Sequence, residues 1–175
     1  MDIIQFEGNG YKVEVARRIS DSFIRDKVVI VQSNDDDFNR KVVSSKNVDI
    51  LLDPHLGYRK DKLHQRDSGL NQVLCELAKE NNVAIGFSFS SVLNSTRRSE
   101  VIGRMIQNII LCRKYKVKMV IGTFAVSEKD VRNLKDVQAF FRALGMTGKE
   151  VQMNFVSERL DWKKRYISKG VMLSR

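Results

Sequence analysis

The sequence predicts an α/β fold in which parallel strands alternate with helices, as in a TIM barrel. Three short apolar runs, at residues 27–31, 48–52 and 83–89, have the β-branched composition of strands that are buried on both faces. Each run is followed by a segment whose apolar residues recur with helical spacing. Such strand–helix–strand units build parallel sheets with right-handed crossovers.

The number of these units limits the architecture. Further strands are expected at 12–15 and 118–122. The 175 residues thus contain five predicted strand–helix units. A complete eightfold barrel typically needs about 250 residues. We therefore expect one domain over residues 1–175, built either as an incomplete TIM-barrel-like array or as an open doubly wound sheet.

The helices are placed by their caps and apolar stripes. A helical segment is expected at 17–24, and another follows the N-cap candidates at 33–35. The next begins at Ser68, because apolar residues follow at i, i+3, i+4, i+7 and i+8 from Leu70. A long helix spans 99–115, and two capping boxes, at 127–130 and 147–150, open two more. Residues 161–175 read as a basic helix or tail.

Charge is the first indication of function. The chain carries a net charge of +10, and the excess lies after residue 53, where 23 basic side chains face 11 acidic ones. A field of this sign favours a polyanionic partner. No apolar run has the length of a membrane span. Cys75 and Cys112 lie among apolar neighbours, so we expect reduced, buried thiols and a cytoplasmic protein.

The sequence offers no self-sufficient active site. It has neither a GxGxxG that opens a helix nor a GxxxxGK[ST] motif, and its two histidines, His55 and His64, share one loop. A catalytic zinc site needs three protein ligands. Asp53 with His55 makes at most a partial site, and a solvated or capping role is expected for this histidine. No catalytic residue and no metal ligand is predicted.

The functional signal is a set of cations in three loops that each follow a predicted strand. The loop after 48–52 is far longer than the usual 2–6 residues and also contains Tyr58, which could stack on a base. Because parallel strands end at one edge, the three loops are expected to converge on one RNA-binding face. The predicted phosphate-binding residues are Arg59, Lys60, Lys62, Arg66, Arg97, Arg98, Arg132 and Lys135. The alternative is that the cations of the first loop pair with Asp61 and Asp67.

Several strings resemble a known family. They are VDILLDP, RDSGLNQVL, LAKENNVAIGFSF, KYKVKMVIGT and the DVRxxxD pattern at 130–136. Together they resemble the archaeal and eukaryotic thirty-kilodalton protein subunit of ribonuclease P, called component 3 in archaea. The similarity runs from about Lys27 to Met146, and it is fairly specific because the turn Arg66-Asp67-Ser68-Gly69 follows the correct strand.

The resemblance implies a barrel related to metal-dependent phosphoesterases but without their metal ligands. It implies a subunit of the ribonuclease P holoenzyme that supports the catalytic RNA in removing 5′ leaders from precursor tRNA. The implied partners are that RNA, precursor tRNA, component 2 and other ribonuclease P proteins. The protein itself would bind no cofactor, and Mg²⁺ would lie on the RNA. Asp67, Ser68 and Gly69 would form a structural or partner-binding turn.

The chain departs from the family at its start and in its loop. We expect the opening strand and helix of the family to be absent, and the barrel therefore to be open-sided or closed by a partner. The loop from Gly57 to Gln65 is expanded. Two other functions stay open: a metal-dependent phosphoesterase that uses Asp53, His55 and Asp67, and a scaffold that binds only protein.

Overall fold

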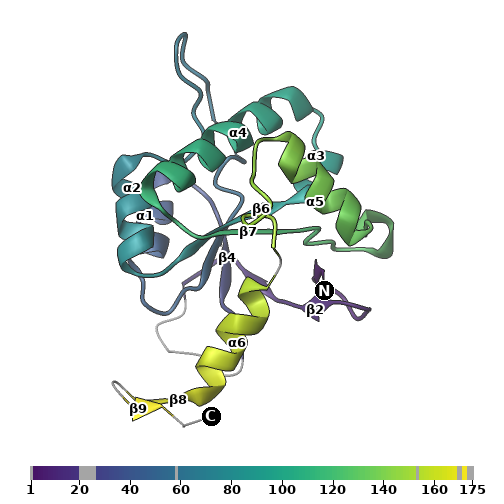
Figure 1. Ribbon diagram of the computed structural model, residues 1–175. Helices are drawn as coiled ribbons and strands as arrows, with labels where there is room; N and C mark the ends of the chain where they lie inside the picture. The colour runs from purple at the N-terminus through teal and green to yellow at the C-terminus, as the bar shows by residue number, and fades with distance from the viewer. Residues whose placement is uncertain (1, 20–26, 58, 153, 169–170, 173–175) are drawn as a thin grey trace.

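Five parallel strands form the central sheet, in the order β3-β4-β5-β6-β7 (Figure 1). The structure, a computed structural model, describes residues 2–19, 27–57, 59–152, 154–168 and 171–172. Strand order follows chain order, which is the arrangement of a barrel and confirms the expected parallel α/β fold. The strands are β3 (Val15–Ala16), β4 (Ile30–Gln32), β5 (Ile50–Leu52), β6 (Ala84–Ser88) and β7 (Met119–Gly122).

Helices cover the outer face of this sheet. They are α1 (Asp36–Ser44), α2 (Gln72–Glu80), the short α3 (Phe89–Leu93), α4 (Arg98–Tyr115) and α5 (Leu134–Ala143). Alternate strand residues divide the apolar side chains between two cores. Leu51, Ile85 and Ile121 join the core beneath the helices, whereas Ile50 and Leu52 join a second core on the inner face.

Two short N-terminal strands connect the edges of the sheet. In β1 (Ile3–Ile4), Ile4 forms a parallel bridge with Ala125, just beyond β7. On its other side β1 pairs with β2 (Tyr11–Lys12), and β2 leads after two residues into β3 at the opposite edge. The barrel that the sequence left open-sided, or closed by a partner, is therefore spanned by the chain's own first residues.

A barrel of so few strands has a narrow interior, and two glycines give room there to larger apolar side chains. A Cβ at Gly86 would lie 2.9 Å from a side-chain carbon of Ile50, and one at Gly122 would lie 3.2 Å from Ile3. The inner core combines these glycines with Ala84, Ile30 and Val120.

Helix α6 (Phe155–Arg165) closes the amino-terminal end of the barrel through a buried ionic contact. The carboxylate of Asp49, 1% exposed, accepts from Arg159 Nε at 2.6 Å and pairs with Lys163. It also accepts from the Val29 N–H at 2.7 Å. Lys163, within the segment expected as a basic helix or tail, is buried too and lies in this helix. After the helix, β8 (Tyr166–Ser168) and β9 (Val171–Met172) pair antiparallel.

Three expected helix starts differ from the structure. Asn71, not Ser68, caps α2, because its side chain accepts the Leu74 N–H while Ser68 is buried in another contact. The box at 127–130 forms only one 3₁₀ turn, η1 (Glu128–Asp130), and α5 starts later with Asn133 as its cap. The box at 147–150 forms a turn instead of a helix.

The expected helix at 17–24 lies mostly outside the described residues. Among the described helices, none combines the length and hydropathy that spanning a lipid bilayer requires.

The contact of α6 with the barrel can be tested by Asp49→Asn. Removing the carboxylate leaves two buried cations without their anion, so we expect the free energy of unfolding to fall by about 3 kcal/mol. Asp161→Asn, on the exposed side of the same helix, is the control and should change it by about 0.5 kcal/mol or less. Urea unfolding followed by circular dichroism measures both, and equal small effects would contradict the role of Asp49.

Candidate nucleic-acid interface

The loop between β5 and α2 divides into a rigid base and a projecting tongue, which we define as residues 60–66. Lys62 N–H donates to the Gln65 carbonyl at 2.8 Å, and this antiparallel bridge closes a tight turn. Figure 1 shows the tongue rising past α4, away from the sheet. At its tip Leu63 is 92% exposed.

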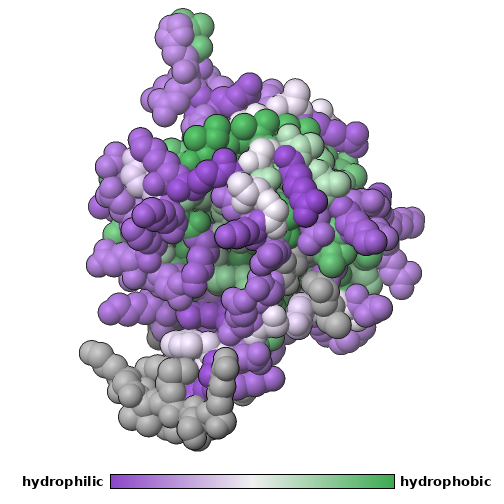
Figure 2. All heavy atoms as spheres, in the orientation of Figure 1, coloured by the Kyte–Doolittle hydropathy of each residue, from purple (hydrophilic) through white to green (hydrophobic). Residues whose placement is uncertain are grey.

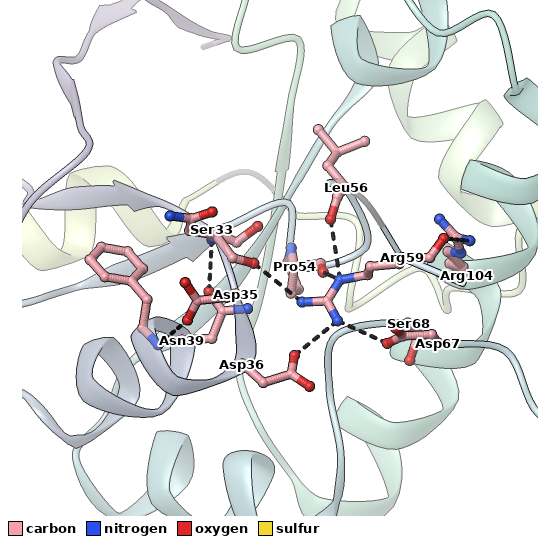
Figure 3. Close-up of polar contacts among 12 residues, drawn as sticks. Ser33, Asp35, Asp36, Asn39, Pro54, Leu56, Arg59, Asp67, Ser68 and Arg104 are labelled. Atoms are coloured by element: carbon pink, nitrogen blue, oxygen red, sulfur yellow. Dashed lines mark hydrogen bonds and ion pairs between the residues drawn. The ribbon is translucent and has the colours of Figure 1, made fainter. Parts of the chain in front are cut away.

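Arg59 lies in the base of this loop and is 7% exposed. Its Nε donates to the carbonyls of Pro54 and Leu56 at 3.0 and 3.2 Å, and its Nη1 contacts Asp36 and Asp67 at 2.9 and 2.8 Å (Figure 3). A guanidinium enclosed by these acceptors has little capacity left for a phosphate. Arg59 thus belongs to the framework of the loop, and its expected place on an RNA-binding surface is corrected.

Arg104, on α4, is a functional residue that the sequence analysis missed. It is 3% exposed, and its guanidinium donates to Asp61 Oδ1 at 2.8 Å and to the Arg59 carbonyl at 3.0 Å. Desolvation raises the pKa of Asp61, but the hydrogen bonds that it accepts, first that from Arg104, hold its pKa below the usual value. The available signal was spacing, since Arg104 and the buried Asn108 stand four residues apart on the face toward the loop.

The turn Asp67-Ser68-Gly69 is held by hydrogen bonds from α4 and by close backbone contact. Gln107 Nε2 donates to Ser68 Oγ at 3.1 Å, and Asn108 Nδ2 donates to the Ser68 carbonyl at 2.8 Å. Gly69 has φ of +74°, and a Cβ there would lie 1.9 Å from the Pro54 carbonyl oxygen. All three residues thus have structural contacts within the loop.

The remaining cations of the first loop lie in the tongue. Lys60 and Lys62 are exposed, whereas the half-exposed Arg66 lies across Gly103 and 3.6 Å from Asp61. Pairing with Asp61 and Asp67, which the sequence left open as an alternative, is therefore found for Arg66 and Arg59. Tyr58 lies outside the described residues.

The other predicted cations, which we call the second group, are Arg97 and Arg98 where α4 begins and Arg132 and Lys135 where α5 begins. All four are exposed. Arg97 pairs with Glu100, while Arg98 and Arg132 donate to backbone carbonyls and keep their charge unpaired by an acid among the described residues. Figure 1 shows the tongue well apart from the loop that leads into α5. The expected convergence of all three loops is not observed, because the base of the tongue packs on α4.

Asp53 and His55, the partial metal site of the sequence, are both buried. Asp53 accepts the Ser88 N–H at 2.8 Å and the Ser88 hydroxyl at 2.6 Å, while burial raises its pKa to about 6. His55 stacks on Phe87 with ring centroids 6.0 Å apart, and neither ring nitrogen has a hydrogen-bond partner among the described residues. The expected solvated or capping histidine is thus corrected.

The surroundings of this histidine are unfavourable to a cation. Burial, together with the positive charges of Arg104 and Arg59, lowers the pKa of His55 to about 3. The same charges repel a metal ion. The described residues hold no cluster of three or more His, Cys, Asp or Glu side chains suited to a metal ion.

The buried histidine makes stability depend on pH. Its folded pKa of about 3 lies below the ordinary value of 6.5, so stability that is present above pH 6.5 is lost as the pH falls. The pKa of Asp53 is raised, so its contribution to the free energy of unfolding grows as the pH falls from about 6 toward 3.8. This offsets part of the loss that His55 causes. The free energy of unfolding, measured with urea, should fall between pH 7 and pH 5 by about 2 kcal/mol less in His55→Phe than in the parent chain. The exposed His64→Gln should behave like the parent chain, and an unchanged loss in His55→Phe would contradict this assignment.

The turn can be tested at Gly69. Gly69→Ala combines a positive φ with a backbone clash, so we expect it to lower the free energy of unfolding by more than about 2 kcal/mol. Gly57→Ala is the matched control, because its φ is +98° but no atom lies within 4 Å of the added carbon. It should cost only the conformational strain, about 1 kcal/mol. Equal losses in thermal or urea unfolding would show that the contact with Pro54 is unimportant.

Comparison with known proteins identifies relatives over most of the chain. The family model described as RNase P subunit p30 matches residues 12–159. Ribonuclease P protein component 3 of Methanosarcina acetivorans is 34% identical over 152 residues, covering 82% of this chain and 60% of the relative. The corresponding protein of Methanocaldococcus jannaschii is 30% identical over 145 residues, covering 79% and 60%.

A solved structure is similar as well. A chain of the cryo-EM structure of archaeal ribonuclease P with mature tRNA matches with a TM-score of 0.65 and 28% identity, over 78% of this chain and 57% of that chain. This similarity agrees with the expected TIM-barrel-like fold. The chain spans about 60% of the length of the curated relatives it matches. By its sequence and its fold, the chain belongs to the RNase P subunit p30 family.

Proposed function

We propose that this chain is a protein subunit of ribonuclease P, where it binds and stabilises the catalytic RNA that removes 5′ leaders from precursor tRNA. The observation that carries the proposal is its similarity, at a TM-score of 0.65, to a chain of archaeal ribonuclease P with mature tRNA. The net charge of +10 supports it, because a positive surface attracts RNA.

Phosphate binding is assigned first to Arg98, Arg132 and Lys135 of the second group. Their side chains are exposed and charged, and one Arg guanidinium can bind two oxygens of a phosphate at once. Arg97 contributes less, because Glu100 neutralises it. In the tongue, Lys60 and Lys62 are also exposed, and Lys62 lines a groove against α4.

The hydrolytic chemistry is assigned to the RNA and its Mg²⁺ ions rather than to this chain. Two observations support this division. The Asp53 carboxylate is engaged by Ser88, and the positive charges of Arg59 and Arg104 act on His55. A phosphoesterase that uses Asp53, His55 and Asp67 would also need Asp67, which Arg59 holds.

The proposed partners are ribonuclease P RNA, precursor tRNA, component 2 and other ribonuclease P proteins. Component 2 follows from the family resemblance. A cytoplasmic location is proposed with them, in keeping with Cys75 and Cys112, which are free and buried thiols.

The RNA-binding role is tested by Arg98→Glu, Arg132→Glu and Lys135→Glu combined in one chain. The measurement is affinity for the RNA that copurifies with the native complex, titrated against salt. Each lost phosphate contact lowers the slope of log affinity against log salt by somewhat under one unit. We expect the triple variant to lose about two units of slope and at least about tenfold in affinity.

The matched control reverses two exposed cations of α1, by Arg40→Glu and Lys41→Glu. The control should keep a slope near that of the parent chain. If the triple variant and the control change equally, the second group is not the phosphate-binding surface. If the parent chain shows no salt-dependent binding to this RNA, the scaffold that binds only protein becomes the better account.

A further inference from the structure

The tongue and helix α4 flank an open groove of about 730 Å³, whose lining combines four aliphatic side chains with polar and charged ones. Leu63 of the tongue forms one side, and Ile106, Ile110 and Leu111 of α4 form the other. Leu63 is 92% exposed and Ile110 is 57% exposed. Figure 2 shows a hydrophobic tip on the projecting tongue and a hydrophobic band on the body below it.

Single exposed apolar residues are ordinary, but a set that lines one concave surface is a mark of a binding site. The tip of a tight turn usually carries Gly, Asn or Asp, whereas here Leu63 and His64 occupy it. No fold requirement on the described residues explains a leucine there, since its side chain lies in water.

The tongue is also held in place before any partner arrives. Asp61 accepts from Arg104 at 2.8 Å and from the Asp67 N–H at 3.0 Å, which fixes the root of the tongue. Gln107 donates to the Arg66 carbonyl at 3.1 Å on the other strand of the tongue. A preorganised anchor loses little conformational entropy on binding, which increases affinity.

The charges beside the groove are positive. Lys62 and Arg66 line it, and its one acidic lining residue, Asp61, is already paired with Arg104 and Arg66. An occupant that buries the aliphatic walls while facing these cations must carry apolar side chains with carboxylates beside them.

This chemistry favours protein over RNA. RNA offers phosphates, sugars and base faces, and proteins usually bind unstacked bases with aromatic rings or free guanidinium groups. Among the described residues the lining has no Phe, Tyr or Trp, its one aromatic ring is that of His64 at the tip, and Arg66 is held over Gly103. Four aliphatic side chains give a nucleic acid little to bind, but they match the apolar centre of a protein interface.

We propose that the groove between the tongue and α4 docks a segment of a partner protein whose apolar side chains are flanked by Asp or Glu, with Leu63 as the anchor. The proposal rests on the proposed function in one respect, that the chain works inside a complex with other proteins. The site differs from the second cationic group, which is assigned to RNA.

The test is site-specific photocrosslinking in the complex purified from its native cells through a tag on this chain. Benzoylphenylalanine replaces Leu63 in one chain and Ile110 in another, and it replaces the exposed Val126, far along the chain after β7, as the control. We expect both groove positions to crosslink to one polypeptide, at a peptide that contains apolar residues beside Asp or Glu. Val126 should not crosslink to that peptide.

The crosslinked polypeptide is then purified and titrated with the chain. Leu63→Asp should weaken binding at least about tenfold, as for an interface anchor, and Lys62→Glu should weaken it less and reduce its salt dependence. Leu63 is almost fully exposed, so Leu63→Asp leaves the fold intact. Crosslinks from Leu63 and Ile110 to RNA, the absence of crosslinks in a complex that cleaves precursor tRNA, or unchanged affinity in Leu63→Asp would each overturn the proposal.

The outcome is separable from that of the proposed function. A complex that cleaves precursor tRNA but gives no protein crosslink would refute the groove and leave the ribonuclease P role standing. A specific protein crosslink in a complex that does not cleave precursor tRNA would support the groove and contradict the ribonuclease P role.

Discussion

The buried guanidinium of Arg59 is the interaction on which the functional end of the molecule depends. It joins the start of α1, through Asp36, to both ends of the loop that follows β5, through Pro54 and Asp67. A charge this deeply buried is tolerated only with its acceptors in place, so the surrounding segments must adopt one arrangement. Arg104 extends the network to α4 and fixes the tongue. The projecting residues are thus rigid because the arginines behind them are enclosed.

Much of the barrel could be predicted from the sequence, whereas its closure and much of the site could not. Strands β4 to β7 carry continuous apolar runs, and α2 and α4 carry clear helical stripes, so local patterns identify them. Closure depends on two-residue strands that pair with segments more than a hundred residues away, at Ala125. No local period marks such a pairing. The cap at Ser68 was misplaced because its hydroxyl is used by Gln107 across the loop.

The roles of the charged residues in the candidate site could also be predicted only in part from the sequence. Counting cations in a loop predicted an RNA-binding Arg59, but only the fold reveals that two acids and three carbonyls surround it. Arg104 was missed because the sequence does not show that the buried face of α4, which also carries Asn108, packs against this loop. What remains exposed separates into two surfaces. Arg98, Arg132 and Lys135 are exposed cations, which we propose bind RNA, and the groove beside Leu63 exposes aliphatic area, which we propose binds protein.

The most direct test of this account is hydrogen–deuterium exchange of the Arg59→Lys variant. Lysine keeps the charge but lacks the planar fork that reaches both carboxylates and the three carbonyls at once. The account expects faster exchange across residues 59–69 and at the start of α1, with β6 and β7 unchanged. Exchange in 59–69 that matches the parent chain would contradict it, because the loop would then hold its shape without the Arg59 network.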